Sequence, residues 1–195
     1  MKRRDLLKAG LGLPLFSHAG IALAEPGLQR VYAQPNASMP PTLPRDHGAH
    51  AAFRTEWWYF TGWFESPALS QPLGVQITFF RSAPNVNVLN PSAFSPKQLL
   101  FAHAAVAIPS VGKLKHDQII RRAGSGGALI QSTNEQVLNI QMPGWQLQSA
   151  QGEQWECKIQ TPQLTVDLRM EQTQTPWMQG LGGYSQKGPQ AEQSS

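Results

Sequence analysis

Short runs in which hydrophobic and polar residues alternate recur along most of the chain. The most distinctive run occupies residues 55–64 and reads Thr-Glu-Trp-Trp-Tyr-Phe-Thr-Gly-Trp-Phe, where only Glu56 and Gly62 are residues that strands disfavour. Side chains of a strand point alternately to its two faces. One face of this run carries Trp57, Tyr59, Thr61 and Trp63, and the other carries Glu56, Trp58, Phe60 and Phe64. Both faces are therefore apolar enough to be buried.

Further strand-like runs follow at nearly regular spacing, with turn residues between them. They occupy residues 74–82, 99–108, 116–122, 129–132, 136–142, 145–149, 153–160 and 163–170. The Ser-, Pro- and Gln-containing segment 65–72 predicts a hairpin between the first two strands. Many short strands separated by turns are typical of an antiparallel meander, sandwich or barrel. We therefore predict a mainly β fold.

The N-terminus has the three regions of a secretory signal peptide: a charged start, an apolar run over residues 9–24, and Ala-Leu-Ala before Glu25. The adjacent Arg3 and Arg4, followed by Leu-Leu-Lys, resemble the twin-arginine pattern. A membrane anchor or an amphipathic helix is the alternative, but the run is shorter than the roughly 20 apolar residues that span a bilayer. We expect a periplasmic or secreted protein from which residues 1–24 are removed.

The rest of the chain divides into three parts by composition. Residues 25–50 contain prolines at positions 26, 35, 40, 41 and 44 and show little periodicity, which predicts an extended lead-in. Residues 51–172 form the predicted β domain. Strand periodicity is then lost, and residues 173–195 are predicted to be a loop or the start of a second domain that is missing.

Charge and cysteine content narrow the classes of partner. The formal net charge is +4, but residues 1–24 hold four basic residues against one acidic residue, so the remainder is nearly neutral. This predicts no nucleic-acid partner. Cys157 is the only cysteine and cannot form an intramolecular disulfide. Its alternating apolar neighbours predict a buried core position.

The densest group of polar residues is Arg-Asp-His-Gly-Ala-His at 45–50, followed by Arg54 and Glu56. One interpretation is a metal site, but the spacing matches no strong motif, and we predict no metal. A second is the polar lining of an apolar ligand pocket. A third is structural: Asp46 and His47 cap a turn while Glu56 is paired with Arg54, Arg81 or His103.

His103 stands alone on an alanine-rich strand, where it is either a hydrogen-bonded core residue or a catalytic group. The chain contains no Gly-x-Ser-x-Gly elbow, phosphate-binding loop or dinucleotide fingerprint. The usual serine hydrolase and nucleotide-dependent enzyme classes are therefore disfavoured.

Five blocks of sequence resemble the carotenoid 1,2-hydratase/AttH family of lipocalin-like proteins, in its N-terminal part. They lie at residues 44–50, 53–62, 76–81, 99–105 and 182–189. The most distinctive is Thr-Glu-Trp-Trp-Tyr at residues 55–59. The resemblance implies two lipocalin-like β domains and, for hydratase members, addition of water to a terminal isoprenoid double bond without a cofactor.

Such a reaction needs an acid to protonate the alkene, an aromatic wall to stabilise the carbocation, and a positioned water. The resemblance and these needs give the candidate catalytic residues Asp46, Glu56 and His103. The candidate ligand-binding residues are His47, His50, Trp57, Trp58, Tyr59, Arg81 and Tyr184. Family members carry a further acidic block in a second domain, which this chain does not reach, and its role is carried over to no residue here.

Two functions follow as expectations. The first is a hydratase or hydrolase-like enzyme, in its full-length form, that acts on a hydrophobic isoprenoid or lipid. The second is a non-catalytic protein that binds such a molecule, in association with an ABC transport system. An aromatic pocket without a positioned acid would favour the second, and the fold alone does not decide between them.

Overall fold

The computed structural model describes residues 30–65, 67–86, 89–133, 137–150 and 154–190. The predicted signal peptide at 1–24 lies outside the described residues. Two antiparallel β-sheets dominate the structure, with short 3-10 helices η1 (Arg45–His47) and η2 (Pro109–Val111). Within these ranges, no helix has both the length and the apolar character needed to cross a bilayer.

The first sheet contains β1 (Thr55–Phe64), β2 (Leu73–Ser82), β3 (Leu99–Ile108) and β4 (Lys113–Arg122), in that order. Each strand is antiparallel to the next and hydrogen-bonded along its length. The β3–β4 turn passes through η2 and Gly112, whose φ of 65° suits glycine far better than other residues. Alternating aromatic and β-branched residues explain why these segments are strands.

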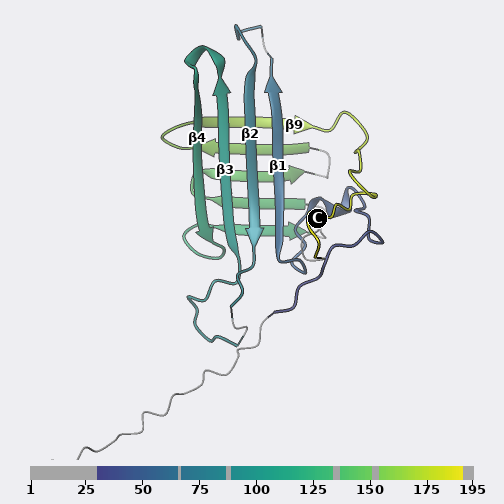
Figure 1. The fold of residues 1–195 in the computed structure, drawn as a ribbon. Coiled ribbons are helices and arrows are strands. Elements are labelled where there is room, and N and C mark those ends of the chain that lie inside the picture. Colours follow the sequence, from purple (N-terminus) through teal and green to yellow (C-terminus); the bar gives the residue numbers. More distant parts are fainter. Residues whose placement is uncertain (1–29, 66, 87–88, 134–136, 151–153, 191–195) are drawn as a thin grey trace, which may run out of the picture.

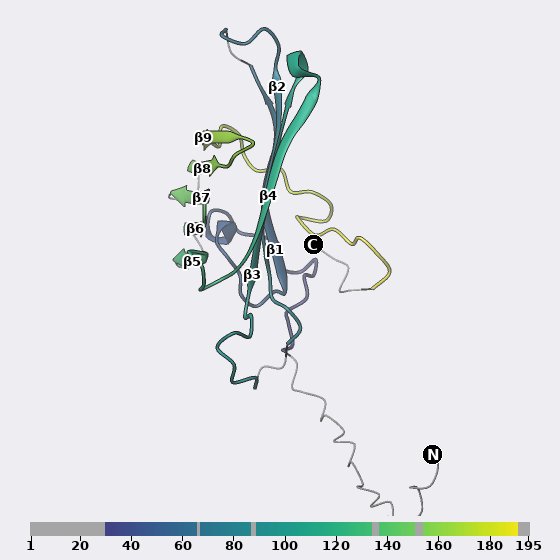
Figure 2. The ribbon, with the colours of Figure 1, turned by 90° about the vertical axis from the view of Figure 1, so that its left-hand side faces the viewer.

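The second sheet contains β5 (Leu129–Thr133), β6 (Val137–Met142), β7 (Trp145–Ala150), β8 (Gln154–Gln160) and β9 (Thr165–Glu171). Its strands run crosswise to those of the first sheet, against which it is stacked (Figures 1 and 2). The hydrogen-bonded order ends at β4 in one sheet and begins at β5 in the other. Of the predicted alternatives, the fold is therefore a sandwich and the barrel is not closed.

The core lies between the two sheets. The first sheet contributes Ile77, Phe79, Leu100, Ala102 and Ala104, and the second contributes Leu138, Ile140, Leu147, Cys157 and Ile159, all buried. The predicted burial of Cys157 is confirmed. Burial, with a smaller contribution from the charge of Asp167, raises the pKa of its thiol to about 12, so the thiol stays neutral near pH 7.

The first sheet is longer than the second sheet is wide. Beyond β9, the β1–β2 and β3–β4 hairpins project past the second sheet, as Figure 2 shows. The last four residues of β1 and the first four of β4 are accordingly exposed. The projecting hairpins leave apolar residues uncovered, including Trp63 and Leu114.

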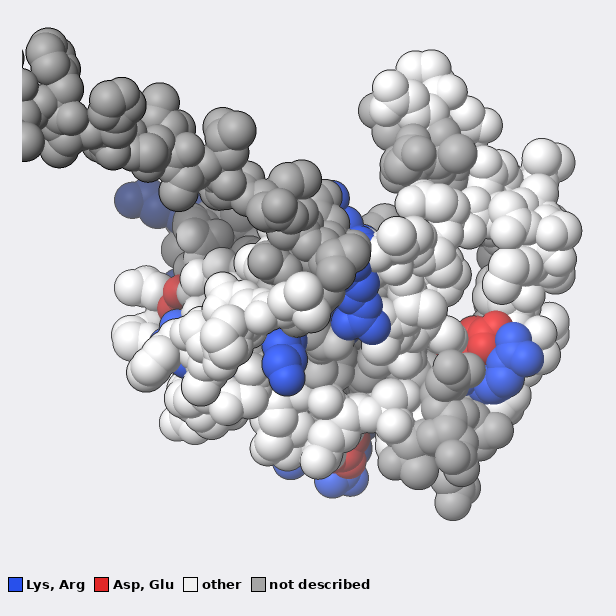
Figure 3. All heavy atoms as spheres, turned by 90° about the horizontal axis from the view of Figure 1, so that it is seen from below, with Lys and Arg blue, Asp and Glu red and all other residues white. Residues whose placement is uncertain are grey.

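Charged side chains are sparse on the face seen from below. In Figure 3, basic groups are scattered among uncharged side chains, and some lie beside acidic groups, rather than forming one basic patch. This distribution matches the low charge of the chain beyond residue 24.

Candidate functional site

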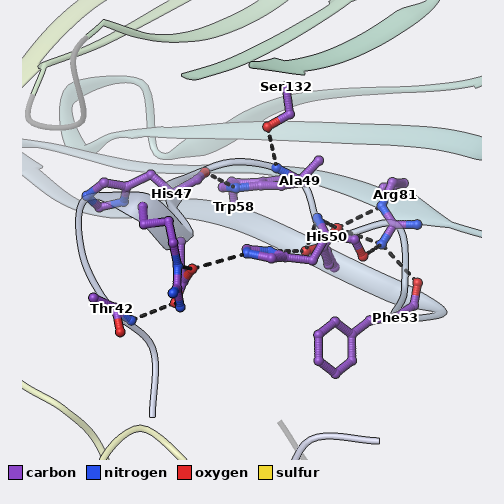
Figure 4. Close-up of polar contacts among 11 residues, drawn as sticks. Thr42, His47, Ala49, His50, Phe53, Trp58, Arg81 and Ser132 are labelled. Atoms are coloured by element: carbon purple, nitrogen blue, oxygen red, sulfur yellow. Dashed lines mark hydrogen bonds and ion pairs between the residues drawn. The ribbon is translucent and has the colours of Figure 1, made fainter. Parts of the chain in front are cut away.

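Four of the predicted site residues, Asp46, His50, Glu56 and Arg81, form one polar cluster. Glu56 on β1 lies opposite Arg81 on β2 in the strand register. Both point to the side of the first sheet that faces the second sheet. The loop after η1 carries His50, whose ring lies between the carboxylate of Glu56 and that of Asp46 in η1 (Figure 4). The three carboxylate and imidazole side chains are between 12% and 22% exposed, and Arg81 is 1% exposed.

Arg81 is the buried centre of this polar cluster. Its Nε donates to Oε2 of Glu56 at 2.8 Å, and its Nη2 lies 2.6 Å from the same oxygen. Nη2 also donates to the backbone oxygens of His50 and Phe53, at 2.8 and 2.9 Å. Among the described residues, Nη1 has no hydrogen-bond partner. Of the predicted partners of Glu56, Arg81 is thus confirmed.

His50 lies between the two carboxylates. Its backbone N–H donates to both oxygens of Glu56, at 2.8 and 2.9 Å. Its Nδ1 is 2.8 Å from Oε1 of Glu56, and its Nε2 is 3.5 Å from Oδ1 of Asp46. Asp46 also accepts bonds from Arg45 Nε at 2.6 Å and from the Thr42 backbone N–H at 2.6 Å. Both carboxylates therefore have several donors.

These contacts determine how the two carboxyl groups titrate. Burial raises the pKa of Glu56, but the His50 hydrogen bond and the Arg81 charge outweigh it, so the net pKa lies below its ordinary value. For Asp46, the Arg45 hydrogen bond lowers the pKa to about 2 despite the opposing effect of burial. Both groups are ionised near neutral pH, where they accept hydrogen bonds and cannot donate a proton.

The loop that carries the polar cluster is attached to both sheets. The backbone oxygen of His47 accepts a bond from Trp58 Nε1 on β1 at 3.1 Å. The His47 ring packs edge-on against Trp155 on β8, at 5.5 Å between centroids. The Ala49 N–H donates to Ser132 Oγ on β5 at 3.1 Å (Figure 4). The loop thus joins the two sheets, which share no strand pairing within the described residues.

Two further aromatic candidates, Trp57 and Tyr59, lie on the opposite side of the first sheet, here called the outer face. The register places Trp57, Phe80, Phe101 and Ile120 in one cross-strand row, and Tyr59, Thr78, His103 and Gln118 in the next. Trp57 and Tyr59 are exposed, whereas His103 is half-buried, with its ring centroid 5.5 Å from that of Phe80. His103 and Glu56 are on opposite faces, so the predicted alternative that they pair is wrong.

A hollow of about 740 Å³ lies on the outer face and continues around β4. Its outer-face lining includes Phe80, Phe101, His103, Gln118 and Ile120, and its inner-face lining includes Ile119 and Trp145. Because the lining residues come from both faces, the hollow follows the free edge of β4 and does not form an enclosed chamber. It contains no residue of the polar cluster.

The structure therefore separates the predicted site residues. The polar cluster takes up Asp46, His50, Glu56 and Arg81, with His47 and Trp58 beside it, whereas Trp57, Tyr59 and His103 share the outer face. Tyr184 belongs to neither group; its backbone pairs with Leu181 in a turn. Among the described residues, no three His, Cys, Asp or Glu side chains are placed to hold a metal ion.

The sequence did not identify Phe80, Phe101 and Ile120 as site residues. Phe80 and Phe101 lie on strands with apolar residues on both faces, and Ile120 follows Ile119 on a mostly polar strand, so alternation does not show which face is buried. The useful signal is their pairing with Trp57 and with each other, which requires the strand register. That register is a property of the folded sheet.

Sequence and fold are both similar to those of AttH-like proteins. Residues 34–195 match the family model AttH, described as AttH-like. The fold resembles that of a Nitrosomonas europaea protein whose crystal structure bears the name AttH, with 37% sequence identity and a TM-score of 0.69. The match covers 83% of this chain and 47% of that protein, so this chain spans about half its length. A search of curated proteins gave no match.

Proposed function

Because the chain belongs to the AttH-like family, we propose that it binds a hydrophobic isoprenoid or lipid, with its ligand on the outer face of the first sheet. The observation that carries the proposal is the hollow of about 740 Å³ lined by Phe80, Phe101 and Ile120 and by the imidazole of His103. Mostly apolar walls with a few polar groups are the usual composition of sites for apolar ligands.

The chemistry of the lining defines the ligand class. Aromatic and aliphatic side chains favour a hydrocarbon chain or ring system. The half-buried His103 ring can donate or accept a hydrogen bond, which suits a hydroxyl or carboxyl end group. An amphiphile such as an isoprenoid alcohol or a fatty acid meets both requirements.

Export belongs to the same proposal. The signal-like residues 1–24 support delivery to the periplasm or beyond by the twin-arginine route. The test is the N-terminus of the protein recovered from the periplasmic fraction, which is expected to be Glu25. Replacement of Arg3 and Arg4 by lysine is expected to keep the precursor in the cytoplasm; unchanged export would rule out this route.

A second candidate function, hydration of an isoprenoid alkene by the full-length protein, is supported by the position of His103 beside an aromatic wall. A protonated imidazole would transfer its proton to one alkene carbon, leaving a carbocation that aromatic faces stabilise. A water molecule would then bond to the other carbon and return a proton to the imidazole. Asp46 and Glu56 are less suited to this step because both have lowered pKa values.

Probe displacement tests the binding proposal. The chain from Glu25 onward is titrated with N-phenyl-1-naphthylamine, whose fluorescence rises in apolar sites, and the probe is then displaced with farnesol or with oleate. Phe101→Ala and His103→Ala are expected to weaken binding several-fold. Trp177→Ala is the control because Trp177 is exposed and outside the hollow. Equal binding by all four proteins would contradict the proposal.

The hydration candidate has a separate readout. Turnover of farnesol in ¹⁸O-labelled water by a full-length AttH-like protein would add one labelled water to the product, detected by mass spectrometry. Binding without this addition supports the non-catalytic function, whereas addition that disappears in the variant equivalent to His103→Gln supports catalysis. Addition that survives this change would remove His103 from the mechanism.

A further inference from the structure

The projecting hairpins end in apolar side chains that no described residue covers. The hairpin tips comprise residues 61–65, 67–76 and 105–116. Their exposed apolar side chains are Trp63, Phe64, Leu69, Val111 and Leu114. Trp63 is 73% exposed and Leu114 is 58% exposed. Soluble domains seldom expose large apolar side chains together, and such groups usually mark an interaction surface.

The uncovered apolar side chains occur on both faces of the tips. Trp63 and Leu114 belong to the outer face, in the same cross-strand row. Phe64 belongs to the opposite face, across from the half-buried Leu73. A flat protein partner would cover one face only. A surrounding apolar medium accounts for exposure on both faces and at the turns.

The charged residues near the tips indicate which kind of apolar medium they would contact. Lys113 and Lys115 flank Leu114, and both are exposed. Glu65 is the only acidic residue in the described part of the tips. Lysine extends its ammonium to the headgroups while its methylene stem lies along apolar surface, and tryptophan favours the membrane interface. This combination is complementary to an anionic bilayer surface.

An apolar hollow lies at the base of the tips. It measures about 380 Å³ and is lined by Phe60, Phe64 and Val75 from the first sheet and by Leu168 and Met170 from β9. It is placed where β9, the last strand of the second sheet, passes beneath the projecting hairpins (Figure 2). The hollow therefore lies between β9 and the β1 edge of the first sheet, at the base of the tips.

From these features we infer that the hairpin tips dock on an anionic lipid bilayer, with Trp63, Phe64, Val111 and Leu114 inserted at the headgroup level and Lys113 and Lys115 at the surface. The inference goes beyond ligand binding on the outer face and does not depend on it. If both hold, docking places the protein at the source of a membrane-soluble ligand.

Vesicle flotation tests the docking. The chain from Glu25 onward is mixed with vesicles of phosphatidylcholine and phosphatidylglycerol in a 70:30 ratio, or of phosphatidylcholine alone. The protein is expected to float with the anionic vesicles and less with the neutral ones. Trp63→Asp and Leu114→Asp are each expected to weaken anionic-vesicle binding by about ten-fold or more, because each removes a large apolar side chain from the interface.

Two controls make the result specific. Leu181→Asp changes a similarly exposed leucine outside the tips and is expected to float as the parent protein does. Lys113→Glu with Lys115→Glu is expected to abolish the preference for anionic vesicles while melting temperature is unchanged. No flotation by the parent protein, or equal flotation by Trp63→Asp, would overturn the inference. So would a self-association that Trp63→Asp breaks without any vesicle binding, because a second copy would then cover the tips.

The same variants distinguish this inference from the proposed function. Trp63→Asp and Leu114→Asp are expected to bind N-phenyl-1-naphthylamine in solution as the parent protein does, because neither residue lines the outer-face hollow. Flotation without probe binding would sustain membrane docking and contradict the ligand proposal. Probe binding without flotation would support the ligand proposal and contradict membrane docking.

Discussion

The polar cluster and the outer face are built from the same two strands, yet they present opposite chemistry. Glu56 and Arg81 point toward the second sheet, and their chain neighbours Trp57 and Phe80 point away from it. In the polar cluster, Glu56 accepts bonds from two residues and Arg81 is almost completely buried. On the outer face, Trp57 and Tyr59 are exposed and His103 is half-buried.

This contrast separates a structural role from a binding role. Buried charges are tolerated when they are paired and hydrogen-bonded, and the polar cluster uses those bonds to attach the loop after η1 to the first sheet. Exposed aromatic groups make few contacts within the protein and are available to a ligand. Residue types that suit catalysis can thus be clustered in sequence and still serve the fold.

The largest expected effect is on the polar cluster. Arg81→Met leaves the Glu56 carboxylate buried without its guanidinium partner, and is expected to lower the free energy of unfolding by about 3 to 5 kcal/mol. Arg169→Met is the matched control: Arg169 pairs with Glu156 at 3.2 Å but is 80% exposed, so the loss should stay below about 1 kcal/mol. Urea denaturation measures both. Equal losses would remove the distinction between the buried and exposed pairs.

Glu56→Gln is expected to have the next largest effect. The amide retains the shape of the side chain but cannot accept bonds from Arg81 and His50 as a carboxylate does, and stability should fall by about 1 to 3 kcal/mol. Probe binding by the folded variant should be unchanged because Glu56 does not line the outer-face hollow. A variant as stable as the parent protein would show that the carboxylate is not structural.

The pH dependence of stability should originate in the polar cluster. Glu56 and Asp46 have folded-state pKa values below their ordinary values of 4.5 and 3.8, with Asp46 at about 2. Their stabilising effect is present above the ordinary values and is lost as pH falls through the folded-state values. Stability should therefore decline below about pH 4.5 and continue to decline toward pH 2. Denaturation at each pH should show a smaller decline in Glu56→Gln.

Much of the fold was predictable because it depends on local patterning. The predicted strands at 55–64, 99–108 and 145–149 agree with β1, β3 and β7. The pairing of Glu56 with Arg81 is one of several alternatives that the sequence offers. The register of β1 and β2, which places the two residues opposite each other, selects it. The choice between a sandwich and a closed barrel was not predictable in the same way. It depends on whether strands of the two sheets pair with each other, which local patterning does not determine.

The candidate site was only partly predictable. Segment 45–50 was recognised by composition, and it does supply Asp46 and His50 to the polar cluster. The position of His103 was ambiguous because its strand has alanine on both sides of it, and small apolar residues do not mark which face is buried. The hollow depends on β4 and on the β7 residue Trp145, which only the packed structure places together.

The smallest expected change in stability is at the outer face. His103→Gln keeps a half-buried polar group on the sheet, so the melting temperature should shift little. Binding of N-phenyl-1-naphthylamine and its displacement by farnesol should weaken several-fold, because the ring contributes both contact area and a hydrogen bond. Gln118→Ala is the comparison variant, because Gln118 lies opposite His103 on β4. Its probe affinity shows how much of the change is due to substitution in this cross-strand row and not to the imidazole itself.

The direct test of the division between the two regions is a paired measurement on Glu56→Gln and His103→Gln, each compared with the parent protein at pH 7. Melting temperature and probe affinity are determined on the same samples. Glu56→Gln is expected to lower the melting temperature and leave affinity unchanged, while His103→Gln is expected to weaken affinity and leave the melting temperature nearly unchanged. A folded Glu56→Gln protein that no longer binds the probe, together with a His103→Gln protein that binds normally, would contradict it.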